Sequence, residues 1–208
     1  MKILIELHYL PCLEYMAILS NAEKIYLEAH ENFPKQTARN RCYILSSHQT
    51  QRLSIPVSYQ APCPIGKVQI DNAQHWQKIH WRAICSAYGK APFFTFFKDE
   101  LAVFFERKYD NLWEWNVDLL KFCFKILRLN PEIVCSEAYE KQVSGEIVDM
   151  RNRFSTEKSL IGQPKSYLQV FGNDFVPNLS ILDLIFCEGT QAKTYLGILG
   201  KALLENSK

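Results

Sequence analysis

The chain has 208 residues, of which 48% are hydrophobic, and its formal net charge is +2. This length and composition predict one globular domain over residues 1–208, or one domain with a subdomain, and a real hydrophobic core. The small net charge gives no electrostatic reason to expect a nucleic-acid partner. No run approaches the ~20 apolar residues that a membrane-spanning helix needs.

The N-terminus and the cysteines both favour a cytoplasmic location. Lys2–Leu7 contains Glu6 and is followed by His8, without a small-residue cleavage site, so it indicates a buried strand rather than a signal peptide. The seven cysteines are scattered without CxxC spacing, which is typical of reduced, buried thiols. A Cys–His nucleophile such as Cys12 with His8 stays open as an alternative, because it requires exposure and a lowered thiol pKa.

The first seventy residues predict a small mixed sheet. Lys2–Leu7 and Lys24–Ala29 are apolar runs joined by a helical pattern over about Leu13–Asn21, which predicts a parallel, right-handed βαβ unit. Arg41–Leu45 and Arg52–Val57 flank a polar segment and predict an antiparallel hairpin.

Helical periodicity dominates the rest of the chain. Residues 75–94 predict an amphipathic helix that is capped by Asp71 and stopped by Gly89 and Pro92. Further helices are expected over about Phe94–Arg107, Leu112–Leu127, Leu179–Phe186 and Gln191–Leu204, and Glu132–Ser136 is expected to return to the sheet. Residues 141–173 are polar and should form the least regular part, acting as a lid over the site. The expected class is therefore α/β or α+β, with a mixed sheet first and a helical C-terminal half.

Several enzyme classes lack their motifs in this sequence. It contains no GxxxxGK[ST], no GxGxxG after a strand, no HExxH and no GxSxG. His75 and His80 lie about 140° apart around a helix, too far to grip one metal ion easily. We therefore predict no metal site, and the sequence indicates no particular cofactor.

One imidazole lies on the apolar face of the helix predicted over residues 75–94. His80 shares that face with Trp76 by helical spacing, so it must be desolvated and needs a hydrogen-bond partner. It is either a core histidine or a general base with a pKa near neutrality. Asp183, in the helix near residue 180, is either solvated or the carboxylate that orients His80. We predict His80 and Asp183 as the catalytic residues.

Polar side chains next to element ends form the expected substrate-binding set. The loop after a parallel strand is where ligands bind in α/β folds, which singles out His8 and Tyr9. Lys35, Arg39 and Arg41 either hold a phosphate or carboxylate or line a solvated hairpin edge.

One asparagine and three aromatic residues each have two alternative roles. Asn178 is either a helix N-cap or part of an anion site at a helix start. Tyr9, Tyr15 and Trp76 either stack on a sugar or base or pack in the core. The sharpest prediction is that His8, His80 and the Asn40–Arg41 pair meet in one cleft.

Several motifs together resemble those of the WbqC-like protein family. The most specific are FVPNLSILDL at residues 175–184 and the pair Asn40-Arg41. The others are W-x3-H at Trp76 and His80, Tyr88-x-Lys90-Ala91-Pro92-x-Phe94, and Asp149-x-Arg151-Asn152. The resemblance extends from Met1 to about Gly189 and adds Tyr88 and Arg151 to the substrate-binding residues. Many members begin the first loop as QPYF-x-P, where this chain has Leu7-His8-Tyr9-Leu10-Pro11.

The resemblance implies a function as well as a fold. Some members of the family lie among genes for bacterial surface-polysaccharide synthesis, and attachment of an amino acid such as glycine to an amino sugar is suggested for them. The expected function is therefore acyl or aminoacyl transfer to a nucleotide-linked amino sugar, a small-molecule partner, from an unspecified donor. The alternative is a non-catalytic ligand- or protein-binding protein. An enzyme should gather its polar groups in one concave pocket, whereas a partner-binding protein should scatter them and expose an apolar patch.

Overall fold

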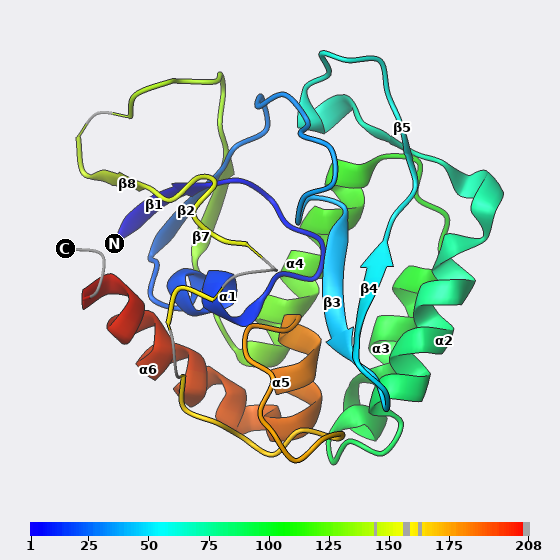
Figure 1. Cartoon of the computed structure of the whole chain (residues 1–208). Coiled ribbons are helices and arrows are strands. Elements are labelled where there is room, and N and C mark those ends of the chain that lie inside the picture. The colour runs from blue at the N-terminus through cyan, green and yellow to red at the C-terminus, as the bar shows by residue number, and fades with distance from the viewer. Residues whose placement is uncertain (144, 156–158, 162–163, 206–208) are drawn as a thin grey trace.

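A four-stranded parallel sheet with strand order β7-β2-β1-β8 organises the N-terminal part of the molecule (Figure 1). The structure is a computed structural model and describes residues 1–143, 145–155, 159–161 and 164–205. The strands are β1 (Lys2–Ile5), β2 (Lys24–Leu27), β7 (Glu132–Cys135) and β8 (Ile147–Asp149). All neighbours run parallel, so their carboxyl ends meet at one edge of the sheet.

The predicted βαβ unit is confirmed. β1 pairs in parallel with β2, with Lys2 opposite Lys24, and α1 (Leu13–Leu19) connects the two strands. Strand side chains alternate between the two faces, and Ile3, Ile5 and Ile25 are fully buried on the face that joins the hydrophobic core. Figure 1 shows α1 beneath the sheet, with α6 alongside it.

One strand lies where an irregular segment was expected. Ile147–Asp149 forms β8 and pairs with β1, with Leu4 opposite Asp149. Three residues are too few to show an alternating pattern, and it is the ladder with β1 that holds them extended. The other described residues between 141 and 173 lie in neither helix nor strand. Residues 144, 156–158 and 162–163 of the segment that was predicted to be irregular lie outside the described residues.

The predicted hairpin is also confirmed, with a shorter second strand. β3 (Arg41–Leu45) pairs antiparallel with β4 (Thr50–Ser54), and Arg41 lies opposite Ser54. β4 stops before Pro56, because proline has no N–H to donate to a ladder. The chain then forms a separate short pair, β5 (Val57–Ser58) with β6 (Gln69–Ile70).

The helix expected over residues 75–94 begins at Trp76 and ends at Tyr88, before Gly89 as predicted, but it is separated from its predicted cap. Asp71 caps a short 3₁₀ helix, η2 (Asn72–Gln74), by accepting a hydrogen bond from Ala73 N at 3.0 Å. His75 follows with a left-handed φ of 42°, so α2 comprises only Trp76–Tyr88. The predicted capping role of Asp71 therefore belongs to η2 and not to α2.

Helices are the main regular elements after residue 75, as predicted. After α2 they are α3 (Phe94–Glu106), α4 (Leu112–Leu127), α5 (Ile181–Glu188) and α6 (Ala192–Glu205), with the 3₁₀ turn η3 (Gly189–Gln191) before α6. Another 3₁₀ turn, η1 (Ile65–Lys67), precedes β6. The fold is thus α/β with a mixed set of strands and a helical C-terminal half. Within the part of the chain that the structure describes, no helix has both the length and the hydropathy to cross a membrane.

Candidate functional site

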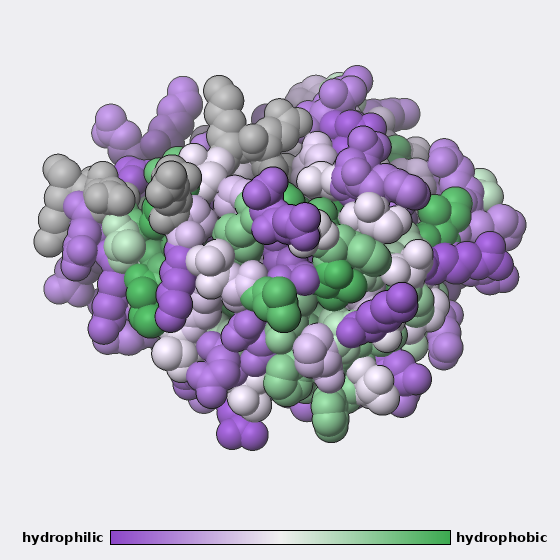
Figure 2. Space-filling model, turned by 60° about the horizontal axis from the view of Figure 1, so that its bottom comes forward, coloured by the Kyte–Doolittle hydropathy of each residue, from purple (hydrophilic) through white to green (hydrophobic). Residues whose placement is uncertain are grey.

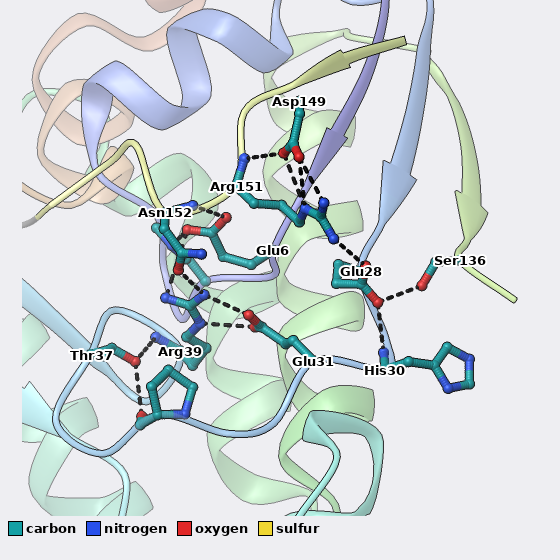
Figure 3. Close-up of polar contacts among 12 residues, drawn as sticks. Glu6, Glu28, His30, Glu31, Thr37, Arg39, Ser136, Asp149, Arg151 and Asn152 are labelled. Atoms are coloured by element: carbon teal, nitrogen blue, oxygen red, sulfur yellow. Dashed lines mark hydrogen bonds and ion pairs between the residues drawn. The ribbon is translucent and has the colours of Figure 1, made fainter. Parts of the chain in front are cut away.

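The carboxyl edge of the parallel sheet carries a network of charged side chains (Figure 3). Glu6 follows β1, Glu28 follows β2, and Arg151 and Asn152 follow β8. The chain leaves β1 through α1 and adds β2 and then β7 on one side of β1. It then crosses from β7 to the other side of β1, where β8 pairs with it. Ligands of parallel α/β proteins bind at such a reversal of strand order. The network therefore occupies the position in the fold where a ligand site is expected.

Glu6 and His8 form a buried pair at the end of β1. Glu6 Oε1 lies 2.9 Å from His8 Nε2, and both side chains are inaccessible to solvent. Glu6 Oε2 accepts a hydrogen bond from Asn152 N at 2.9 Å, and Arg39 Nη1 lies 3.7 Å from Oε1. Burial raises the pKa of the Glu6 carboxyl, but His8, Arg39 and Asn152 together lower this pKa to about 2. Glu6 is therefore a carboxylate at neutral pH.

The imidazole of His8 is held on one side and unpaired on the other. Its ring stacks on Tyr15 with centroids 4.4 Å apart, and Tyr15 donates a hydrogen bond to Glu6 O at 2.7 Å. Its Nδ1 is buried and has no hydrogen-bond partner among the described residues. When Nε2–H donates to the Glu6 carboxylate, Nδ1 carries the lone pair. The pair then has the chemistry of a carboxylate-oriented base.

Arg39 connects this pair to two loops. Its Nε and Nη2 donate to Glu31 at 2.9 and 2.7 Å, a bidentate ion pair. Nη2 also donates to Asn152 Oδ1 at 2.7 Å. The Arg39 side chain is 5% exposed, so the segment after β8 and the loop before β3 are fixed to each other directly beside Glu6.

The other half of the network centres on Arg151. Its guanidinium donates to Asp149, to Glu28 Oε2 at 3.0 Å and to the backbone carbonyl of Glu140. Glu28 also accepts hydrogen bonds from Ser136 Oγ at 2.8 Å and His30 N at 2.9 Å. Because protein groups engage Nε, Nη1 and Nη2 of Arg151, its geometry is that of a cross-link between strand ends.

His80 lies in a different cluster from His8. Its Nδ1 is 2.9 Å from the Tyr9 hydroxyl, and its ring meets Trp76 edge to face at 5.2 Å. Burial lowers its pKa to about 4, with a backbone hydrogen bond to Ser54 opposing the shift. His80 is thus a neutral core histidine that links α2 to the loop after β1 and to β4. This geometry matches the core-histidine alternative.

The predicted pairing of His80 with Asp183 is wrong. Asp183 is fully buried on α5, where its Oδ2 accepts hydrogen bonds from Tyr167 at 2.6 Å and Gln169 at 2.9 Å. Burial raises the pKa of Asp183, and these two hydrogen bonds oppose the rise. Tyr88, also predicted as a site residue, is fully buried close to Asp183, whose charge adds to burial in raising the tyrosine pKa. Asp183 anchors the 167–169 segment to α5.

Asn178 caps a helix, but not the one that follows it. Its Oδ1 accepts a hydrogen bond from Glu14 N at 3.1 Å, in the first turn of α1, and its Nδ2 donates to Ser155 O at 3.0 Å. α5 is capped instead by Ser180, which accepts from Leu182 N. Asn178 has a left-handed φ of 55°, which asparagine tolerates better than most residues.

The loop before the hairpin lies directly against the loop after β1. Tyr9 N donates to Ala38 O at 2.8 Å, and Asn40 Nδ2 donates to Ile55 O at 2.9 Å. Lys35 is exposed and Arg41 is half-buried. The structure therefore joins the His8–Tyr9 loop at Ala38 to the loop that leads into Asn40 and Arg41, and it connects Tyr9 to His80, while Asp183 and Asn178 belong to other contacts.

Sequence reasoning missed the carboxylates that build the network. Glu6-Leu7-His8 and Glu28-Ala29-His30 are the same E-x-H pattern, and each directly follows one of two neighbouring parallel strands. Ile5 lies opposite Leu27, so Glu6 and Glu28 leave the sheet side by side. A charged residue at the same position after two adjacent apolar strands was the available signal. Asn152 belongs to the Asp149-x-Arg151-Asn152 motif, whereas Glu31 had no comparable signal, because its contact with Arg39 depends on how the loop folds.

The fold and this charged edge define a parallel α/β protein with a polar site at the carboxyl ends of its strands. The chain belongs to the WbqC-like protein family, whose model matches residues 7–165. That range contains the network except Glu6, and it does not contain FVPNLSILDL at 175–184. The chain is also 26% identical to the uncharacterized protein Rv1507c of Mycobacterium tuberculosis, over 93% of this chain and 96% of that protein. No solved structure matches.

Proposed function

We propose that the protein transfers an acyl or aminoacyl group to the amine of a small molecule, with a nucleotide-linked amino sugar as the substrate class. The observation that carries the proposal is the buried Glu6–His8 pair with an unpaired His8 Nδ1. It stands at the carboxyl edge of the sheet, where parallel α/β proteins bind ligands. The type of reaction and the sugar substrate are inferred from the family resemblance.

In the proposed reaction, His8 rather than His80 is the base. The amine nitrogen attacks the carbonyl carbon of an activated ester or thioester donor, forming the amide bond while the bond to the leaving group breaks. His8 Nδ1 takes the proton from the attacking amine, and the ionised Glu6 stabilises the imidazolium that results. His80 is unsuited to this role because both of its contacts are structural and its pKa of about 4 makes it a weak base.

The alternative, a non-catalytic binding protein, is favoured by one observation. The Glu6 and His8 side chains are inaccessible to solvent, as expected for a network that only holds loops together. A partner-binding surface should also show a continuous apolar area. Figure 2 shows one face of the molecule, where apolar side chains form small groups separated by polar ones. This face therefore gives the alternative little support.

The test compares His8→Gln with His80→Gln. The protein is first screened by thermal shift against nucleotide sugars, acyl thioesters and aminoacyl donors, and transfer between the stabilising compounds is followed by mass spectrometry. Glutamine at position 8 can still donate to Glu6 but has no basic nitrogen, so we expect turnover to fall at least about 100-fold. His80→Gln should keep most of the turnover. Equal activity of His8→Gln and the wild type would exclude the proposed base.

A further inference from the structure

The outer face of the β3–β4 hairpin carries two arginines without carboxylate partners. Arg41 lies directly opposite Ser54 and Tyr43 directly opposite Arg52, so all four side chains point to the same face of the ladder. The inward positions are occupied by Cys42 and Leu53, which are buried in the core. Arg52 is exposed and Arg41 is half-buried.

The charges of this face differ from those of the network beside it. Arg39 and Arg151 are each bound by carboxylates, whereas neither Arg41 nor Arg52 has an ion pair among the described residues. Diagonal neighbours on a ladder lie roughly 7–8 Å apart, and like charges at such positions repel. Two guanidiniums in this arrangement therefore present an uncompensated positive charge.

Unpaired hydrogen-bonding groups coincide with this charge. Arg41 Nε and Ser54 Oγ are both buried and without a hydrogen-bond partner among the described residues. Leaving such atoms unsatisfied costs roughly 1–3 kcal/mol each, so native proteins supply a partner. A buried guanidinium N–H beside a hydroxyl group is a donor set that fits an oxyanion.

We propose that Arg41, Ser54 and Arg52 form a subsite for the oxyanion of a small ligand, either a phosphate or a carboxylate. The loop that leads into β3 is joined to the loop after β1 by the Tyr9 N–Ala38 O hydrogen bond, so the subsite and the Glu6–His8 pair belong to connected loops. As the place where the anionic part of the transfer substrate binds, it rests on the proposed function. Binding of the anion itself can be measured without any turnover.

The experiment titrates the protein with inorganic phosphate, pyrophosphate and acetate, and follows the backbone amide resonances of residues 41 and 54 by NMR. We expect saturable shifts, and an increase in Kd of at least about ten-fold in Arg41→Gln. Ser54→Ala, which keeps the charge, should weaken binding by a few-fold. Arg82→Gln is the matched control, because Arg82 is an exposed arginine on α2 without an ion pair among the described residues; it should leave Kd within about two-fold of wild type.

The outcomes distinguish a phosphate from a carboxylate ligand, and they test the subsite separately from the proposed function. Binding of phosphate and pyrophosphate but not acetate assigns the subsite to a phosphate group, and binding of acetate as tightly as phosphate assigns it to a carboxylate. The proposal is overturned if no anion gives saturable shifts, or if Arg82→Gln weakens binding as much as Arg41→Gln in folded proteins. If Arg41→Gln abolishes anion binding but no transfer is found, the proposed function fails and the subsite stands. If transfer is found and Arg41→Gln changes neither Kd nor KM, the subsite fails and the function stands.

Discussion

Two buried histidines in this protein have opposite environments. His80 has a hydroxyl and a backbone group as partners, and burial leaves it neutral with a pKa of about 4. His8 has a carboxylate on Nε2, an arginine nearby, and an unpaired Nδ1. Burial alone therefore does not mark a catalytic histidine. The difference is a charged partner on one nitrogen and no partner on the other, as an oriented base requires.

The largest expected effect comes from removing the carboxylate that distinguishes the two histidines. Glu6→Ala should destabilise the fold by about 3–5 kcal/mol, because it breaks a buried ion pair and leaves the Asn152 amide without its acceptor. Urea denaturation of Glu6→Ala and Glu146→Ala measures this difference. Glu146 is the control, since its ion pair with Lys2 is exposed to solvent and should contribute far less to stability. Equal losses would show that Glu6 has no special structural role.

The pH dependence of stability should report the two clusters in separate ranges. The pKa of His80 falls from 6.5 to about 4 on folding, so the unfolded state binds more protons between these values. The contribution of neutral His80 to the free energy of unfolding is on the order of 2–3 kcal/mol. It is complete above pH 6.5 and is lost as the pH falls towards about 4. The pKa of Glu6 falls from 4.5 to about 2, so its contribution is lost only below pH 4.5.

Urea denaturation between pH 3 and 8 checks these ranges with His80→Gln as the comparison. The variant should show a flatter dependence between pH 6.5 and 4 and keep the loss below pH 4.5. An unchanged slope between pH 6.5 and 4 would show that His80 does not titrate as its burial implies.

The smallest effect concerns the segment that ties the C-terminal half to the start of α1. Asn178→Gly removes the side chain that caps α1 while tolerating the left-handed backbone, and should cost about 1 kcal/mol. Asn178→Ala should cost more, because alanine adds strain at φ 55°. Thermal denaturation of both variants measures the difference. Equal stability of Asn178→Gly and the wild type would show that the Glu14 contact contributes nothing.

Local patterns predicted most of the fold. Short apolar runs predicted β1 and β2, two runs around a polar segment predicted the hairpin, and helical periodicity predicted the helices of the C-terminal half. Two corrections to the fold have causes that no periodicity shows. His75 interrupts a helix through one left-handed residue, and β8 is a three-residue strand that depends on its ladder with β1.

The candidate site was predicted less well, for a physical reason. Burial of His80 followed from its position on an apolar stripe, but its partner, Tyr9, lies 71 residues away in the sequence. The His8 loop was identified because it follows a parallel strand, whereas Arg39 and Asn152 contribute through a hydrogen bond that spans 113 residues. Which polar groups meet depends on how loops from distant parts of the chain close over one another.

The position of β1 has a consequence for biosynthesis. β1 is an interior strand, but its partner β8 lies at residues 147–149, and the cap of the following helix is supplied by Asn178, 164 residues after Glu14. During synthesis, the backbone N–H and C=O groups along one edge of the apolar strand β1 stay unpaired until more than two thirds of the chain has emerged from the ribosome. Sequence-distant parallel pairing of this kind closes slowly and exposes an aggregation-prone edge. Truncation before residue 147 would leave that edge permanently unpaired, so nascent chains of this length are the ones expected to need a chaperone.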